Sequence, residues 1–215
     1  MRFRTIVLAG IACAVTAPAW AGSGFYVGAG LGSQSPMNSD WKAPSLNQFG
    51  KYSLKRSNTF IADAGYKFSS GLRIEIESQF GQFDGHDIIN DPLNLVSDLH
   101  GHISQSTVYL NANYDFPIFS GLGGSVGAGI GSAWSSAKGS AFSGLTVVHG
   151  DDRAFAWQIG GGITHRILPN LDVQLDYRYQ GAGSMTVTES GGADFHLGSI
   201  KTQTVTLSAR LYILP

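Results

Sequence analysis

Cysteine and charge are both scarce in this chain. Its 215 residues include a single cysteine, Cys13, and Lys, Arg, Asp and Glu together make up only 13% of them. One cysteine cannot form a disulfide within the chain, so a disulfide-stabilised scaffold is excluded. The formal net charge of −1 gives no electrostatic basis for binding nucleic acid, and we expect no nucleic-acid partner.

Long hydrophobic runs are also missing. After residue 21, no apolar stretch approaches the ~20 residues that a membrane-spanning helix needs. A segment that crosses a membrane must pair all of its backbone hydrogen-bonding groups, which only helices and closed β-barrels achieve. If this chain enters a membrane, it must therefore do so as β-strands.

The first 21 residues have the three parts of a secretory signal. Arg2 and Arg4 form a basic start, an apolar stretch runs from Ile6 to Val15, and Ala19-Trp20-Ala21 is an A-x-A cleavage site. We expect residues 1–21 to be a cleaved signal peptide and residues 22–215 to form one domain. The cysteine lies inside the signal segment. Lipidation there is the less favoured alternative, because the residues just before it lack the usual leucine.

Glycine, by contrast, is abundant. It makes up 29 of the 215 residues, about twice its usual share of ~7%. Around the glycines, apolar and polar residues alternate with a period of two, which is typical of β-strands with one apolar and one polar face. The pattern predicts eight strands: Gly24–Gly32, Asn58–Phe68, Leu72–Gly81, Gln105–Phe116, Gly123–Trp134, Phe155–Ile167, Leu171–Gln180 and Lys201–Leu214.

The connections between these strands alternate between long and short. Four long polar segments occupy residues 33–57, 82–104, 135–152 and 184–200, whereas the other connections are short, such as Ser69-Ser70-Gly71 and Leu168-Pro169-Asn170. An even number of strands with this asymmetry is typical of bacterial outer-membrane barrels, and aromatic residues cluster at the strand ends, where lipid interfaces hold them. The predicted fold class is all-β: an eight-stranded antiparallel up-and-down transmembrane β-barrel with four long external loops and short periplasmic turns. The alternative is an exported soluble barrel or sandwich, which is disfavoured because the polar faces carry Gly, Ser and Asn rather than many Lys and Glu.

The polar faces of the predicted strands would line the lumen of such a barrel. In a simple meander the third and seventh strands are diametrically opposed, and so are the first and fifth, whose inner faces are rich in glycine. We expect the glycines to leave room for charged side chains from the other two walls. The lumen would then hold five bases and six acids: Asp63, Lys67, Arg73, Glu75, Glu77, Asp115, Arg166, Asp172, Asp176, Arg178 and Arg210.

Nearly balanced charge in a confined space favours a paired network, because an unpaired buried charge costs several kcal/mol. An eight-stranded barrel is just wide enough for its own side chains to fill. We therefore expect a salt-bridged, plugged lumen without a hydrophobic interior. Two alternatives use the same residues: a narrow conduit for small polar solutes, and a catalytic carboxylate pair such as Glu75 with Asp176, which is much less favoured.

Five histidines fall in or beside the predicted external loops: His86, His100, His102, His149 and His196. His100 and His102 would lie on one side of an extended segment, a spacing that can chelate a transition metal. Polar loops also collect histidine and aspartate simply because they are solvated, and this interpretation is favoured. We expect no cofactor. Protonation of these histidines in acidic surroundings would change the charge of the loops.

The segment His102-Ile103-Ser104 resembles the His-x-Ser portion of outer-membrane lipid A deacylases. Gln105 stands where those enzymes have Asn, and the segment precedes the fourth strand rather than lying in a later one. The Gly-x-Ser-x-Gly stretch at residues 123–127 falls inside a predicted strand, so it does not form the strand-to-helix elbow of a hydrolase. We predict no catalytic residues and no enzyme, with a lipid-modifying enzyme as an alternative.

Three segments resemble the small outer-membrane β-barrel family that includes the opacity-type surface antigens and OmpA- and OmpX-like barrels. They are GFYVGAGLG at residues 24–32, AGYKFSSGLRIEIE at 64–77 and FAWQIGGGITHRILPNLDVQLDYRY at 155–179. The resemblance implies a monomer in the bacterial outer membrane, in contact with its lipid and lipopolysaccharide and inserted by the outer-membrane assembly machinery. It implies a structural role or an adhesion role in which the loops meet a host or surface ligand.

One feature departs from that family. Its barrels usually end in an aromatic residue that the assembly machinery recognises, whereas this chain ends in Pro215. Recognition would then have to depend on Leu211, Tyr212 or Ile213.

Overall fold

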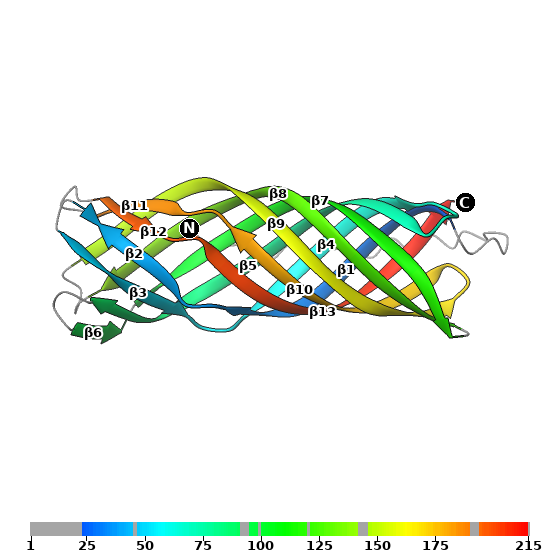
Figure 1. Cartoon of the computed structure of the whole chain (residues 1–215), viewed down its shortest axis with the longest axis horizontal. Coiled ribbons are helices and arrows are strands. Elements are labelled where there is room, and N and C mark those ends of the chain that lie inside the picture. Colours follow the sequence, from blue (N-terminus) through cyan, green and yellow to red (C-terminus); the bar gives the residue numbers. More distant parts are fainter. Residues whose placement is uncertain are drawn as a thin grey trace, which may run out of the picture.

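The computed structural model describes residues 23–44, 47–90, 95–98, 100–119, 121–141, 146–189 and 194–214, almost all of them in β-strands (Figure 1). Eight long strands form a closed antiparallel barrel in the order β1–β4–β5–β7–β8–β9–β10–β13, and β13 pairs with β1. The predicted eight-stranded antiparallel barrel is confirmed. Its strands are β1 (Gly24–Pro36), β4 (Ser57–Lys67), β5 (Leu72–Asn90), β7 (His100–Phe119), β8 (Leu122–Ala141), β9 (Thr146–Leu168), β10 (Leu171–Ala182) and β13 (Ile200–Leu214).

The long connections, predicted as loops, contain further β-structure. β5, β7, β8 and β9 continue beyond the ends of β1, β4, β10 and β13, and five short strands lie beside these extensions. At the left of Figure 1 they form one end of the molecule, called here the hairpin end. The short strands are β2 (Ser39–Ala43), β3 (Gln48–Leu54), β6 (Leu95–Asp98), β11 (Met185–Glu189) and β12 (Asp194–Leu197).

Strand pairing closes the hairpin end into a second ring. β3 pairs with β5, β2 with β3, β12 with β2, β11 with β12 and β9 with β11, while β5, β7, β8 and β9 remain paired as in the first ring. Two rings of eight strands are thus stacked end to end and share four strands. The closures of β12 on β2 and of β11 on β9 rest on two residue pairs each.

The opposite end, called here the turn end, carries tight connections and the last residues of β13 (Figure 1). In the turn between β4 and β5, the amide of Phe68 donates to the carbonyl of Leu72 at 2.8 Å, and Gly71 has a φ of +91°. Only glycine adopts that conformation without strain. Pro215 and residues 1–22 lie outside the described residues. Leu211 and Ile213 face outward on the last strand, whereas Tyr212 is half-buried.

The wall of the first ring is apolar outside and polar inside. Large aliphatic side chains such as Leu31, Ile76 and Leu207 are exposed, while Glu75 and Thr206 are buried. A soluble protein buries its aliphatic side chains, whereas a barrel in lipid exposes them. Among the residues that the structure describes, no helix is long and apolar enough to cross a membrane.

We expect Gly71→Ala to lower the free energy of unfolding by about 1–3 kcal/mol, because alanine is strained at this positive φ. Ser69→Ala, at an exposed position of the same turn, is the matched control and should change it by less than about 0.5 kcal/mol. Urea unfolding of protein refolded into lipid vesicles measures both values. Equal stability of the two variants would contradict the backbone geometry of this turn.

Candidate functional site

The interior of the first ring is bridged by side chains from opposite walls. Glu77 on β5 accepts a hydrogen bond from Arg178 on β10 at 2.5 Å. One step closer to the hairpin end, Gln180 on β10 donates its side-chain amide to Gln79 on β5 at 2.8 Å. Since β5 and β10 lie four strands apart in the ring of eight, these bonds cross the full width of the lumen.

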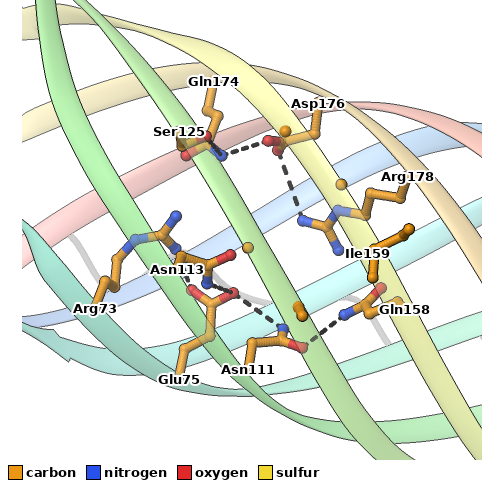
Figure 2. Close-up of a pocket in the computed structure, with 14 residues that line it drawn as sticks. Arg73, Glu75, Asn111, Asn113, Ser125, Gln158, Ile159, Gln174, Asp176 and Arg178 are labelled. Atoms are coloured by element: carbon orange, nitrogen blue, oxygen red, sulfur yellow. Dashed lines mark hydrogen bonds and ion pairs between the residues drawn. The ribbon is translucent and has the colours of Figure 1, made fainter.

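Glu75 is the centre of a second group of contacts (Figure 2). Its carboxylate accepts hydrogen bonds from Asn111 and Asn113 at 3.1 Å each and from the hydroxyl of Tyr26 at 2.5 Å. Arg73 forms an ion pair with the same carboxylate. These donors come from β1, β5 and β7, so the group ties one half of the wall together.

Near the turn end, three basic side chains lie around the carboxylate of Asp115. Its carboxylate lies 2.9 Å from Lys67 Nζ, 3.4 Å from Arg73 Nη2 and 3.9 Å from Arg210 Nη1. Arg166 pairs with Asp172 at 3.0 Å between the adjacent strands β9 and β10.

Ten of the eleven residues predicted to line the lumen are therefore joined in ion pairs, and Asp176 is among them through Arg178 at 3.6 Å. Asp63 also faces the lumen, beside Gly28, without a hydrogen bond or ion pair to another described residue. Five further side chains share the inward face with these charges and were not among the predicted lumen residues: Tyr26, Asn111, Asn113, Gln158 and Gln174. The signal that could have found them is the same alternation of inward and outward positions.

The inward-facing glycines make room for atoms of the adjacent strands. The expectation that they leave room for charged side chains from the other two walls was wrong. A Cβ at Gly129 on β8 would overlap the side-chain oxygen of Asn111 on β7, and one at Gly127 would overlap that of Asn113. The side-chain amides of Asn111 and Asn113, which bind Glu75, thus lie against the backbone of the glycine-rich strand β8. One polar cavity within this network has a volume of about 20 Å³, which is room for about one water molecule.

The described inward-facing side chains of the second ring are mostly apolar, so the prediction of a barrel without a hydrophobic interior was wrong. Its inward-facing side chains are almost fully buried, with Trp41 at 1% exposure and Phe83 at 0%. They were missed because their segments were assigned to solvated loops. Tyr52 belongs to the same layer and donates its hydroxyl to the carbonyl of Gly198 at 3.3 Å; burial raises its pKa to about 12. The layer consists of Trp41, Tyr52, Leu54, Phe83, Ile103 and Ile200.

The five histidines considered as metal ligands lie in strands rather than loops: His86 in β5, His100 and His102 in β7, His149 in β9 and His196 in β12. The side chains of His86, His100 and His149 are outside those that the structure describes. His102 is exposed, and His196 Nδ1 lies 3.1 Å from the hydroxyl of Thr186. No group of three possible metal ligands occurs among the described residues. Metal binding by these histidines stays the less favoured alternative.

The residues considered for catalysis are placed as follows. His102 and Ser104 both point outward on β7, and Asp84 on β5 is the register partner of His102. Within the described part of the chain, no hydrogen bond or ion pair joins these three side chains, so they do not form an assembled triad. Glu75 and Asp176 are both held by basic and amide donors of the network.

Comparison with protein-family models gives a match to the outer membrane protein beta-barrel domain over residues 5–211. The chain belongs to this family of outer-membrane β-barrels. It is accordingly a protein of the bacterial outer membrane, with the tight turns in the periplasm and the hairpin end outside the cell. No curated protein sequence matches the chain significantly.

Solved structures of other barrels share the fold. Neisserial surface protein A is 16% identical, with 89% of this chain and 99% of that one covered and a TM-score of 0.57. OprG from Pseudomonas aeruginosa is 13% identical, with 90% and 97% covered and a TM-score of 0.59. AlkL in lipid bilayers is 15% identical, with 94% and 95% covered and a TM-score of 0.52. At these identities the likeness concerns the fold alone.

We expect Arg178→Ala to lower the free energy of unfolding by about 3–5 kcal/mol, because it leaves the fully buried carboxylate of Glu77 without its cation. The double variant Glu77→Leu/Arg178→Met should cost less than the two single changes together, since it removes both charges. Arg56→Ala, at an exposed arginine between β3 and β4, should change stability by less than about 1 kcal/mol. Urea unfolding in lipid vesicles would contradict the network if Arg178→Ala behaved like Arg56→Ala.

Proposed function

We propose that the protein is a non-conducting surface protein of the outer membrane, whose extracellular ring contacts molecules outside the cell. The observation that supports the proposal is the pair of side-chain layers in the interior, ion-paired in the first ring and apolar in the second; we infer that the two layers close the lumen. A protein that offers no path through its lumen acts through its exposed surface. The loops and strands at the hairpin end form that surface.

The polar closure is a network and not a row of separate charges. The Arg178–Glu77 pair crosses the lumen at 2.5 Å, and Glu77 is also held by the side-chain amides of Gln158 at 3.3 Å and Asn111 at 3.4 Å. Opening a path past this point requires several buried charged contacts to break together. That is costly, because each ion would be left without its partner in a low-dielectric space.

The apolar closure lies beyond it, toward the outside of the cell. An ion that passed the first network would meet Leu54 and Phe83, whose side chains offer no hydrogen bonds to replace its water shell. The two closures have opposite chemistry, so neither polar solutes nor apolar molecules find favourable contacts along the whole length.

The outward face of the β2–β3 hairpin has the composition of a contact surface. Phe49 is 50% exposed above the lipid-facing wall, and Lys42 is its register partner on β2. Lys51 lies two residues further along β3, also exposed. An exposed aromatic side chain between cations is a common feature of binding surfaces. The similar Neisserial barrel is named a surface protein, which agrees with this role.

The remaining parts of the proposal come from the sequence. Residues 1–21 are removed as a signal peptide, residues 22–215 enter the membrane as a monomer through the assembly machinery, and outer-membrane lipid and lipopolysaccharide surround the wall. A host or surface ligand would bind at the hairpin end.

Conductance in planar lipid bilayers separates this proposal from the narrow channel for small polar solutes. We expect the purified protein to give no resolved current steps, because both closures block the lumen. Resolved steps that disappear when Glu75 and Arg178 are neutralised would establish the channel and overturn the proposal. Changed lipid A masses in cells that overproduce the protein would instead favour the lipid-modifying enzyme.

Surface contact is tested on whole cells that display the protein. We expect the variant Phe49→Ser/Lys51→Ala to reduce adhesion to host matrix or to neighbouring cells severalfold, with the barrel still folded. Gln203→Ala, an exposed position of β13 away from this hairpin, is the control and should adhere like the unchanged protein. Equal adhesion of all three, and of cells without the protein, would remove the surface-contact role.

A further inference from the structure

The outer wall has a hollow where a row of aromatic side chains is interrupted. Phe60 on β4, Phe80 on β5, Ser106 on β7 and Trp134 on β8 are register partners in succession and face outward. Three of the four are aromatic, and the serine leaves a gap between Phe80 and Trp134. This row lies at the outer end of the lipid-facing wall, where aromatic side chains mark the membrane interface.

The gap belongs to a groove of about 960 Å³ on the outside of the barrel. Leu31 and Phe60 line one end of it and Trp134 lines the other, while Ser104 and Ser136 continue its floor toward the outside of the cell. Its lining is predominantly apolar at the level of the aromatic row and becomes polar above it. A molecule that fits this gradient has an apolar part in the membrane and a polar part at its surface.

A positioned cation lies at the polar side of the groove. Arg153 on β9 is the register partner of Trp134, and its guanidinium carbon lies 5.1 Å from the centre of the indole ring. Its Nε donates to the hydroxyl of Ser132 at 2.8 Å. These two contacts fix the side chain, which is exposed, and neither of them uses its two terminal nitrogens.

The charge of Arg153 is not neutralised by the part of the chain that the structure describes. The neighbouring carboxylate of Asp152 accepts the backbone amides of Arg153 at 2.6 Å and Thr186 at 3.0 Å instead of the guanidinium. No described carboxylate lies within ion-pair distance of Arg153. A guanidinium that is held in place with no counter-ion among the described side chains is suited to bind phosphate through two parallel hydrogen bonds.

The geometry points to a binding site for one phosphorylated glycolipid of the outer leaflet. Its phosphate binds Arg153 and one acyl chain lies in the groove over Ser106, between Phe80 and Trp134. Charge complementarity selects this occupant: the groove opens at the extracellular end, where the surrounding lipid is lipopolysaccharide and carries negatively charged phosphates. The site lies outside the barrel and does not depend on whether the lumen conducts.

The test is the amount of lipid that the protein retains in nanodiscs and through mild detergent, measured by native mass spectrometry. Nanodiscs contain lipid A, dephosphorylated lipid A or zwitterionic phospholipid alone. We expect the unchanged protein to retain one lipid A molecule per barrel and at least about tenfold less of either other lipid, since a charge-assisted hydrogen-bond pair contributes roughly that factor.

Two variants remove the two halves of the site. Arg153→Ala should lower lipid A retention about tenfold, and Arg153→Lys should restore part of it because lysine keeps the charge without the fork of donors. Ser106→Phe should lower retention of all lipids by filling the gap with a third neighbouring ring. A shift in electrophoretic mobility on heating shows that each variant is still folded.

Two residues on the outer face of the barrel serve as matched controls. Arg56 is also an outward arginine whose Nε binds a serine, Ser35, at 3.0 Å, but it does not line the groove. Ser33→Phe places a new ring at an outward position outside the groove. Both Arg56→Ala and Ser33→Phe should retain lipid A like the unchanged protein. An equal loss in Arg153→Ala and Arg56→Ala, or full retention in Arg153→Ala, would overturn the site, as would equal binding of dephosphorylated lipid A.

Discussion

Lipid offers no hydrogen bonds to a polypeptide backbone, and this constraint determines the rest of the structure. Strands that cross the membrane must pair on both sides, so the sheet closes and has no free edge. With eight strands the closed wall leaves a lumen that its own side chains fill. The alternation of the strand then assigns every second residue to lipid and every other one to that narrow space.

The same alternation continues where the surroundings of the wall change from lipid to water. There the inward face becomes apolar and the outward face becomes polar. On β5, Ile76 faces lipid and Glu77 faces inward, whereas further along the same strand Phe83 is buried inside and Asp84 is exposed. Inward positions stay inward throughout. A polar interior is therefore matched to a lipid-facing wall, and an apolar interior to a wall surrounded by water, because in each case the inner face takes the residues that the outer face excludes.

The sequence was sufficient to predict the eight long strands and the inward direction of Arg73, Glu75 and Arg178. A period of two over about ten residues is a strong local signal. The sequence was not sufficient for the second ring. β2 and β12 have five and four residues and meet through two residue pairs, and such short segments carry no periodicity that distinguishes them from loops. The burial of Trp41 follows only from that closure. The place of Arg153 beside Trp134 likewise depends on the register between two strands, which alternation alone does not specify.

Four strands pass without interruption from the membrane into the extracellular ring, and this continuity has a consequence for evolution. The part of the protein outside the cell is a continuation of the wall, so its outward side chains are held on a rigid lattice with fixed spacing. Substitutions at these alternate positions change the chemistry of the exposed face and leave the inward positions that maintain the fold untouched. A partner that binds such a lattice orders little of the protein, so less conformational entropy is lost on association. The barrel can thus diversify its exposed face one side chain at a time, as a scaffold does, with its architecture unchanged.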